Sequence, residues 1–305
     1  MINVLERLSA GARVAVIRLR SLGDCVLTTP AISLLKQARP DLRIAIVVED
    51  RFAPVFAGNP DLESILPPKA PEISRWRPDL TLNLHGGVTS FRLTIAAQSR
   101  WRAGFAHFRF RPVYNVQIPR AQEILGVDRK VHTAEHVASA MFYVGVPEAD
   151  IPRARLFAEA RPSPLPYAVL HPMASAPEKA WPSSNFLAVA EHLDKRLGVA
   201  PVFIAGSGES LDAFARYRTI SGAPLEEIKS LIAGASLFVG NDSGPAHMAA
   251  AFGLPVVVLF GSSDPDIWRP WRTESSVLTN PAGIHSIGTA EAMQAIETVL
   301  APQPQ

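Results

Sequence analysis

The chain has 305 residues, of which 48% are hydrophobic and 19% are charged. This composition excludes the disordered and fibrous classes, and the length predicts two domains at roughly 100–200 residues each. The single cysteine, Cys25, excludes an internal disulfide and a zinc site built from cysteines. The net charge of only +2 and the lack of interleaved stacking motifs argue against a nucleic-acid partner.

The longest apolar runs, 44–48 and 254–260, have the length of strands and fall short of a membrane span. Residues 1–11 lack the basic leader and continuous apolar segment of a secretory signal. We therefore expect a cytoplasmic protein without a transmembrane helix, which also suits the single cysteine.

Strand-like apolar runs alternate with amphipathic segments of helix length along the first half. In chain order, the expected elements are a strand over 13–18, a helix over 24–37, strands over 43–48 and 79–84, a helix over 90–98, a strand over 101–105 and a helix over 132–144. Three prolines then occur within 160–166, where neither an interior helix nor a central strand can form, so we predict a linker there.

The same alternation returns after the prolines. The expected elements are a strand over 167–171, a helix over 183–196, a strand over 201–205, helices over 210–217 and 225–233, a strand over 237–240, a helix over 245–252, a strand over 255–260 and a helix over 289–300. The sequence therefore predicts an α/β protein with two doubly wound, Rossmann-like parallel-sheet domains, 1–159 and 167–305, facing across a cleft.

The two halves differ in charge. Residues 1–158 hold 21 Lys and Arg against 14 Asp and Glu, a net +7, whereas residues 159–305 carry a net −5. Residues 80–122 contain no acid, and their arginines are Arg92, Arg100, Arg102, Arg109, Arg111 and Arg120. This stretch is either a surface that binds anions or simply a solvated face that lacks acids.

The loop after the first strand is the first candidate site, because ligands bind beyond the carboxyl ends of parallel strands. Gly23 permits a tight turn, and Asp24 stands at the start of the next helix. Asp24 is therefore either a helix cap or a carboxylate that acts as a general base on a hydroxyl. Its neighbour Cys25 is expected to be a buried packing residue, since no histidine or second cysteine is visible nearby to activate it.

The string 239–251 again combines a strand end, a turn of small residues and a helix. The good cap residues here are Asn241, Asp242 and Ser243, and Gly244 frees the backbone next to the exposed N–H groups of the helix. Such a helix start binds a diphosphate, and His247 either faces it or packs in the core.

Two further loops follow strands of the second half. Lys179, in the loop 171–182, is placed to neutralise a leaving diphosphate, or else is an ordinary exposed lysine. Glu209 follows the next strand, where it could meet a ligand hydroxyl. The glycines beside it form an incomplete dinucleotide fingerprint, because Leu211 takes the third glycine position, so we reject an NAD site.

Together these loops resemble glycosyltransferase family 9, the heptosyltransferases of lipopolysaccharide core assembly. The resemblance covers most of the chain and rests on four strings: IRLRSLGDCVLTTPA at 17–31, KAWP at 179–182, GNDSGPAH at 240–247 and LFGSSDP at 259–265. It implies the GT-B architecture, with an N-terminal domain for the acceptor and a C-terminal domain for the nucleotide-sugar. It also implies inverting transfer of heptose from ADP-heptose without metal or cofactor.

Carried over by the resemblance, Asp24 is the general base and Lys179 the cation that stabilises the leaving diphosphate. The donor-binding residues would be Ser175, Glu209, Asp242, Ser243, Gly244 and His247. Ser175 is the only hydroxyl of its loop, because Met173 and Ala174 stand where the family often has hydroxyl residues or glycine.

On the acceptor side, the residues expected are Ser21, Gly23, Arg100 and Arg102. An anionic glycolipid acceptor would suit the arginines of 92–120, which could also rest against the inner face of the cytoplasmic membrane. Two other functions stay open: a nucleotide-sugar epimerase of the same architecture, and a non-catalytic module that binds nucleotide-sugars or anionic glycans.

Overall fold

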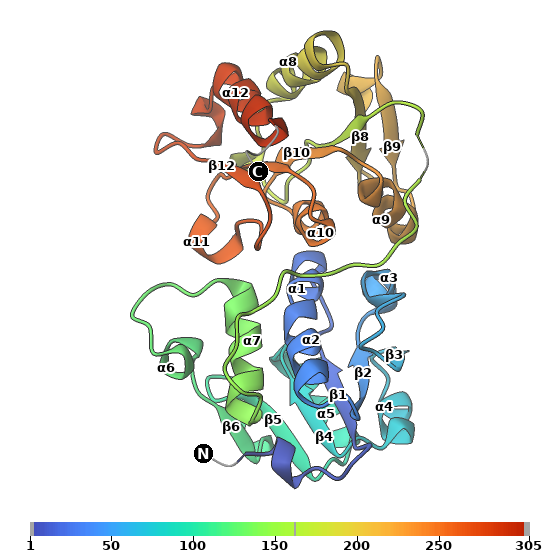
Figure 1. The fold of residues 1–305 in the computed structure, drawn as a ribbon, viewed down its shortest axis with the longest axis vertical. Helices are drawn as coiled ribbons and strands as arrows, with labels where there is room; N and C mark the ends of the chain where they lie inside the picture. The colour runs from blue at the N-terminus through green and yellow to red at the C-terminus, as the bar shows by residue number, and fades with distance from the viewer. Residues whose placement is uncertain (1–2, 162, 302–305) are drawn as a thin grey trace. The chain divides into compact units, whose positions relative to one another are not determined.

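The computed structural model describes residues 3–161 and 163–301. The chain divides into two compact units, Met1–Phe157 and Ala158–Gln305. Each unit holds one six-stranded parallel sheet with flanking helices (Figure 1), which confirms the predicted α/β class with two Rossmann-like sheets. The predicted linker 160–166 includes Pro162, which lies outside the described residues.

The sheet of the first unit has the strand order β3-β2-β1-β4-β5-β6. Its strands are β1 (Arg13–Ile17), β2 (Arg43–Val47), β3 (Ser64–Leu66), β4 (Leu80–Asn83), β5 (Trp101–Phe105) and β6 (Val116–Ile118). Its helices are α1 (Leu22–Val26), α2 (Thr29–Ala38), α3 (Ala53–Phe56), α4 (Ala70–Trp76), α5 (Gly87–Ala96), α6 (Ala121–Leu125) and α7 (Thr133–Val144), with 3₁₀ turns at Leu5–Arg7, Asp50–Phe52 and Arg111–Val113. The strand order reverses between β1 and β4, which is where doubly wound sheets bind ligands.

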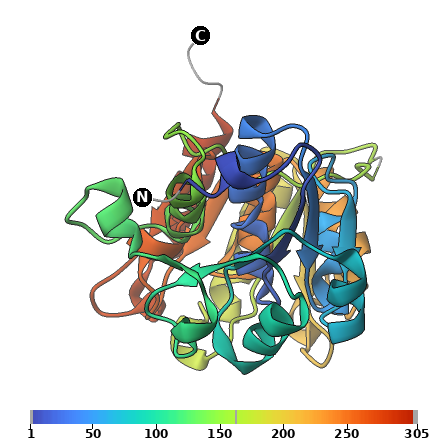
Figure 2. The same ribbon diagram turned by 90° about the horizontal axis from the view of Figure 1, so that it is seen from below.

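Helices cover both faces of this sheet, because successive strand residues point to opposite sides. Ala15 and Ile17 of β1 pack in one cluster with Ile73 of α4 and Leu93 of α5. Helices α2 and α7 pack against each other on the other face (Figure 1, Figure 2). The sheet core is thus closed on both sides, and the loops at its carboxyl edge are left to form a site.

The single helix predicted over 24–37 is wrong, because the chain forms α1 and α2 with a break at Leu27 and Thr28. Pro30 stands in the first turn of α2 and cannot donate a backbone hydrogen bond, so the helix cannot run through it. The Thr28 hydroxyl instead donates to the carbonyl of Asp24 at 2.8 Å, which satisfies one of the carbonyls left free by the break.

The second unit repeats the topology, with the order β12-β11-β10-β7-β8-β9 and its reversal between β7 and β10. Its strands are β7 (Tyr167–His171), β8 (Ala200–Ala205), β9 (Arg218–Ser221), β10 (Leu237–Asn241), β11 (Val256–Leu259) and β12 (Ser275–Leu278). Its helices are α8 (Ser183–His192), α9 (Leu225–Ala233), α10 (Gly244–Phe252), α11 (Pro265–Trp268) and α12 (Thr289–Leu300). Shorter turns occur at Pro177–Lys179, Leu193–Leu197, Asp212–Phe214 and Ile284–Ser286.

Helices α8 and α12 cover one face of this sheet, where Phe186 and Ile296 join the cluster built on Ala168 and Leu170. The helix predicted over 210–217 is wrong, because only one 3₁₀ turn forms there before β9. The helix predicted over 183–196 changes to a π turn after His192. Both differences leave the loops after β7 and β10 in place.

Candidate active site

Asp24 lies in α1, directly after the loop that follows β1. Its carboxylate Oδ2 accepts hydrogen bonds from the Ser21 hydroxyl at 2.9 Å and from the Ser21 backbone N–H at 3.3 Å. This is a capping box, in which the side chain satisfies a free N–H group at the helix start. The Asp24 side chain is nevertheless 23% exposed, so the cap interpretation is correct without excluding contact with a ligand.

The other carboxylate oxygen of Asp24 pairs with Arg18. Arg18 Nη1 lies 3.3 Å from Asp24 Oδ1, and the Arg18 side chain is only 8% exposed. Burial lowers the pKa of Arg18 and the Asp24 charge raises it, and an arginine stays charged in proteins in any case. Asp24 thus compensates a buried cation, which holds one edge of the carboxylate fixed.

Two histidines, His136 and His85, lie near this ion pair. Burial, with the nearby His107 and Arg18, lowers the pKa of His136 to about 4, although Asp24 opposes the shift. Burial and the charges of Arg18 and Arg20 lower the pKa of His85. These imidazoles are therefore neutral at pH 7, and they can exchange hydrogen bonds with a polar ligand without adding charge.

Two pockets open at this edge of the sheet. A pocket of about 110 Å³ is lined by Leu19, Arg20, Glu49 and residues 85–89, in the loops after β1, β2 and β4. A pocket of about 920 Å³ has His107 and His136 in its wall, and its other lining residues are Arg120, Ala121, Gln122, Glu123, Asp128, Arg129 and Lys130. Polar ligand groups thus have room beside the histidines.

The four predicted acceptor-binding residues separate into two groups. Ser21 bonds Asp24 directly, and Gly23 is buried within α1. Gly23 lies inside α1 and does not have a positive φ, so the chain does not use the conformational freedom of glycine at this position. Arg100 and Arg102 lie at the amino end of β5, the opposite end of the parallel sheet from the loop that carries Asp24.

The guanidinium of Arg102 is used inside the protein. Its Nε donates to the Val113 carbonyl at 2.9 Å and its Nη1 to the Ser99 carbonyl at 2.8 Å. The Arg100 guanidinium lies over the Trp101 ring, 5.5 Å from the ring centroid. The structure therefore does not bring these arginines to Asp24, because they stand where β5 begins, whereas Asp24 follows the end of β1.

In the second unit, one buried asparagine holds both ends of the lysine loop, residues 172–181. Asn241 Nδ2 donates to the Pro172 carbonyl at 2.8 Å and to the Met173 carbonyl at 3.4 Å. Asn241 Oδ1 accepts from the Trp181 backbone N–H at 3.1 Å. Sequence reasoning placed Asn241 only among the cap residues, although it belongs to the string that resembles the family.

Asp242 and Lys179 interact at the carboxyl ends of β10 and β7. Burial raises the pKa of Asp242, while the neighbouring Ser263 hydroxyl and the Lys179 charge lower it. The strand register, which pairs Gly240 with His171, brings the loops that carry the two charges together. A carboxylate and an ammonium group in one place can bind the hydroxyl groups and the anionic groups of one ligand.

Helix α10 begins beside this pair. Ser243 is its N-cap residue, but the serine side chain makes no capping hydrogen bond, and Gly244 is the first helical residue. His247 is 4% exposed, with its ring centroid 6.3 Å from that of Trp268. Of the two interpretations of His247, the structure favours packing, and the helix N-terminus itself is left to meet an anion.

Two predicted donor-binding residues lie on exposed loops. Ser175 is exposed within the lysine loop. Glu209 Oε2 accepts a hydrogen bond from the Gly206 backbone N–H at 2.6 Å, so the carboxylate is folded onto its own loop. Glu209 therefore stabilises a turn in this structure.

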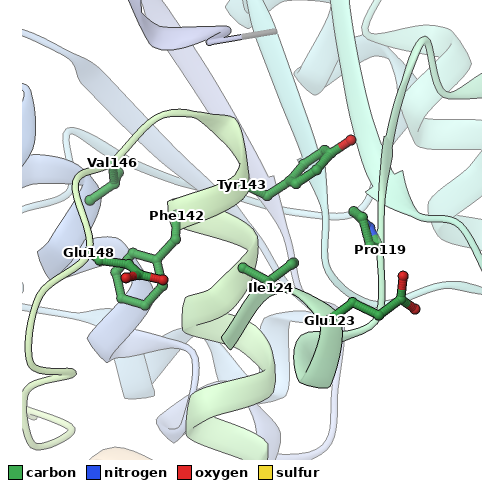
Figure 3. Close-up of a pocket in the computed structure, with 7 residues that line it drawn as sticks. All are labelled: Pro119, Glu123, Ile124, Phe142, Tyr143, Val146 and Glu148. Atoms are coloured by element: carbon green, nitrogen blue, oxygen red, sulfur yellow. The ribbon is translucent and has the colours of Figure 1, made fainter. Parts of the chain in front are cut away.

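A further pocket, which the sequence does not predict, lies between α6 and α7 in the first unit (Figure 3). Its volume is about 500 Å³, and its lining residues are Pro119, Glu123, Ile124, Phe142, Tyr143, Val146 and Glu148. Elsewhere, within residues 3–161 and 163–301, no cluster of three His, Cys, Asp or Glu side chains is arranged to hold a metal ion. Among the helices of the same described ranges, none combines the length and apolar character needed to cross a bilayer.

Solved structures share this fold. The crystal structure of a glycosyl transferase family 9 protein from Veillonella parvula DSM 2008 matches with a TM-score of 0.82 at 23% identity, over 98% of this chain and 99% of that one. The E. coli heptosyltransferase WaaC with ADP matches with a TM-score of 0.77 at 20% identity, over 94% and 100%. Two Rossmann-like parallel sheets with this match define the GT-B class of fold.

The sequence comparisons specify the family. A family model for glycosyltransferase family 9 (heptosyltransferase) matches residues 72–292. Lipopolysaccharide heptosyltransferase 3 of Escherichia coli K12 is 28% identical over 285 residues, which is 82% of this chain and 82% of that protein. The chain therefore belongs to glycosyltransferase family 9, the heptosyltransferase family, which identifies it as a glycosyltransferase and decides against the epimerase and the non-catalytic module.

Proposed function

We propose that the protein is an inverting, metal-independent glycosyltransferase that transfers heptose from ADP-heptose to a hydroxyl of a lipopolysaccharide core-type acceptor. The observation that carries the proposal is that the loops with Asp242 and Lys179 follow the neighbouring strands β10 and β7, so that the Lys179 charge acts on the Asp242 carboxylate next to the start of α10. The similar E. coli protein is named a lipopolysaccharide heptosyltransferase, and the solved WaaC structures contain ADP or ADP-2-deoxy-2-fluoro heptose. These names support the donor and the acceptor class.

In the proposed reaction, Asp24 removes the proton from the acceptor hydroxyl. The oxygen then forms a bond to the anomeric carbon of the donor sugar, while the bond from that carbon to the diphosphate breaks and the diphosphate leaves with the electron pair. The ion pair with Arg18 suits this role, because it keeps one carboxylate oxygen oriented while Ser21 bonds the other.

Lys179 neutralises the charge that develops on the leaving diphosphate. A lysine on a loop acts as a point charge, and its effect is largest in a site from which water is excluded. Ser243, Gly244 and the N–H groups of α10 bind phosphate oxygens, and Asp242 accepts hydrogen bonds from the sugar. Ser175 and Glu209 complete the donor residues, Glu209 at the ribose, and His247 supports the helix from the core.

We assign donor binding to the domain 167–305 and acceptor binding to the domain 1–159, with 160–166 as the linker. Ser21 and Gly23 stay on the acceptor side, because they adjoin Asp24. Arg100 and Arg102 are withdrawn from that role because of their position on β5 and the hydrogen bonds of Arg102. The proposed partner is an anionic glycolipid, and the proposed location is the cytoplasm, at the inner face of the membrane.

Calorimetric titration with ADP, UDP and GDP in the presence of EDTA tests the donor. We expect selective binding of ADP that is weakened by Lys179→Ala, with Lys195→Ala as the control because Lys195 pairs with Glu191 on the surface. Preference for UDP, or full ADP affinity in Lys179→Ala, would contradict the proposal.

A further inference from the structure

Helix α5 carries an exposed apolar stripe on the face that points away from the sheet. Val88 and Ile95 are 48% and 49% exposed, and the exposed Arg92 lies between them, because residues i, i+4 and i+7 share one face of a helix. The opposite face packs in the core, where Leu93 joins the cluster on β1. Within residues 3–161 and 163–301, Leu165 is the one other large hydrophobic side chain that is exposed. Two such side chains on one helix face indicate a surface that meets a partner.

The loop between β5 and β6 lies against this helix. The ring of Phe91 in α5 stacks on that of Phe110 in the loop, with the ring centroids 4.3 Å apart. The 3₁₀ turn Arg111–Val113 contacts α5 as well. The loop thereby holds the exposed Arg109 and Arg111 next to α5. Apolar and basic side chains thus form one surface, the α5 surface, which consists of Val88, Arg92, Ile95, Arg109 and Arg111.

The charged residues of the α5 surface are all basic. The stretch 80–122, which supplies the whole surface, contains no acidic residue. No acidic side chain of the described part of the chain pairs with any of its three arginines. On the adjacent α4, Arg75 Nη1 lies 2.8 Å from Glu72 Oε2, so the Glu72 charge is already compensated.

This combination is complementary to the interface of an anionic bilayer. Apolar side chains enter the boundary between the headgroups and the acyl chains, while arginines are attracted to the negative lipid headgroups. An acidic protein surface would also attract the arginines, but it would leave Val88 and Ile95 without an apolar phase to enter.

The α5 surface adjoins the acceptor side of the candidate active site. Helix α5 follows β4 at the carboxyl edge of the first sheet, and its residues 87–89 line the pocket of about 110 Å³. Leu19 and Arg20 line the same pocket and belong to the loop that leads to Asp24. A bilayer in contact with α5 would therefore lie beside the edge of the sheet that carries the proposed base.

We propose that the α5 surface docks the protein on an anionic lipid bilayer, in which the glycolipid acceptor is anchored. The inference rests on the proposed function, because that function makes the acceptor a lipid. It assigns Arg92, Arg109 and Arg111 to the lipid headgroups and not to the sugars of the acceptor.

Co-sedimentation with vesicles tests the docking without any substrate. We expect the wild-type protein to bind vesicles that contain phosphatidylglycerol more strongly than vesicles of phosphatidylcholine alone, and less strongly at high salt. Each arginine near such a surface contributes about fivefold, so Arg92→Gln/Arg111→Gln should lower the partition coefficient roughly 30-fold. Ile95→Ser should lower it about fivefold, since about half of this side chain is left to be buried. Leu165→Ser and Arg196→Gln, both exposed in the second unit, are the matched controls.

Transfer rates distinguish membrane docking from recognition of the acceptor sugars. With the acceptor embedded in anionic vesicles, Ile95→Ser and Arg92→Gln/Arg111→Gln should both slow transfer. With a deacylated, soluble core acceptor, both variants should match the wild-type protein. A raised KM of the arginine variant for the deacylated acceptor would place the arginines on the sugars and overturn the inference.

The inference is also overturned if the wild-type protein does not bind the anionic vesicles, or if the variants bind them as well as the wild-type protein does. The proposed function then stands, because transfer to the deacylated acceptor does not depend on docking. Absence of transfer by the wild-type protein to either acceptor would contradict the proposed function alone, since vesicle binding is measured without substrate.

Discussion

We predict that Asn241 positions Lys179, because it holds the loop that carries this lysine. The Asn241 side chain is fully buried and bonds backbone groups at both ends of the lysine loop. Asn241→Ala leaves the Pro172 carbonyl and the Trp181 N–H without that partner. At about 1–3 kcal/mol for each of the two buried groups, we expect the free energy of unfolding to fall by about 2–6 kcal/mol.

If Asn241 acts through Lys179, the effect on catalysis must depend on that lysine. We expect Asn241→Ala to lower kcat by roughly tenfold or more, because a small displacement of a catalytic group is costly. In a Lys179→Ala background, the same substitution should change kcat little, so the two effects are far from additive.

The assay is a double-mutant cycle in kcat for glycosyl transfer, with urea unfolding followed by circular dichroism for each variant. Ser236→Ala, before β10, is the control that leaves the Asn241 hydrogen bonds intact. Additive effects on kcat would show that Asn241 supports the fold without positioning Lys179. An unchanged free energy of unfolding would refute the hydrogen-bond reasoning itself.

Three other predictions concern the first unit. The pKa of His136 is about 4 in the folded protein and near 6.5 in the unfolded chain, so the unfolded state binds more protons as the pH falls. From pH 8 to pH 5 the free energy of unfolding should therefore fall by about 2 kcal/mol through this group, and urea unfolding of His136→Phe should lack that loss. Burial raises the pKa of the Cys25 thiol to about 12, so its alkylation by iodoacetamide at pH 8 should be about a thousandfold slower than that of a free thiol. Equal alkylation rates in the native and the urea-unfolded protein would contradict the burial of Cys25. Arg102→Ala should lower the unfolding midpoint, since two hydrogen bonds are lost at about 1 kcal/mol each, and leave the acceptor KM unchanged; a raised KM would return Arg102 to the acceptor site.

Alternation of strands and helices is sufficient to predict the α/β class and the two Rossmann-like sheets, because buried parallel strands leave long apolar runs. The prediction from the sequence did not include the strands β3, β6, β9 and β12, because they are short and, unlike β4 and β11, are not buried along their whole length. The break between α1 and α2 follows from Pro30, which has no N–H to donate. The prediction from the sequence missed it because the apolar pattern continues on both sides of this proline.

For the candidate site, too, the sequence predicts local features but not the contacts between distant segments. Motif position predicts that Asp24, Lys179 and Asp242 stand at carboxyl ends of strands, because that depends only on local order along the chain. Contacts between distant segments do not follow from it: the bond of Asn241 to Trp181 and the approach of Gly261 to Glu178 each join residues more than 50 positions apart. Arg100 and Arg102 show the converse: they are close to one another in the sequence, but they lie at the end of the sheet opposite to the loop that carries Asp24.

The central claim is heptose transfer with Asp24 as the base. Mass spectrometry of a lipopolysaccharide core acceptor, incubated with ADP-heptose and EDTA, measures it directly. The account predicts that the wild-type protein adds one heptose and releases ADP, and that Asp24→Asn slows transfer by about 10²–10⁴-fold with unchanged affinity for ADP-heptose. Transfer by Asp24→Asn at the wild-type rate would leave Asp24 as a helix cap only and contradict the account.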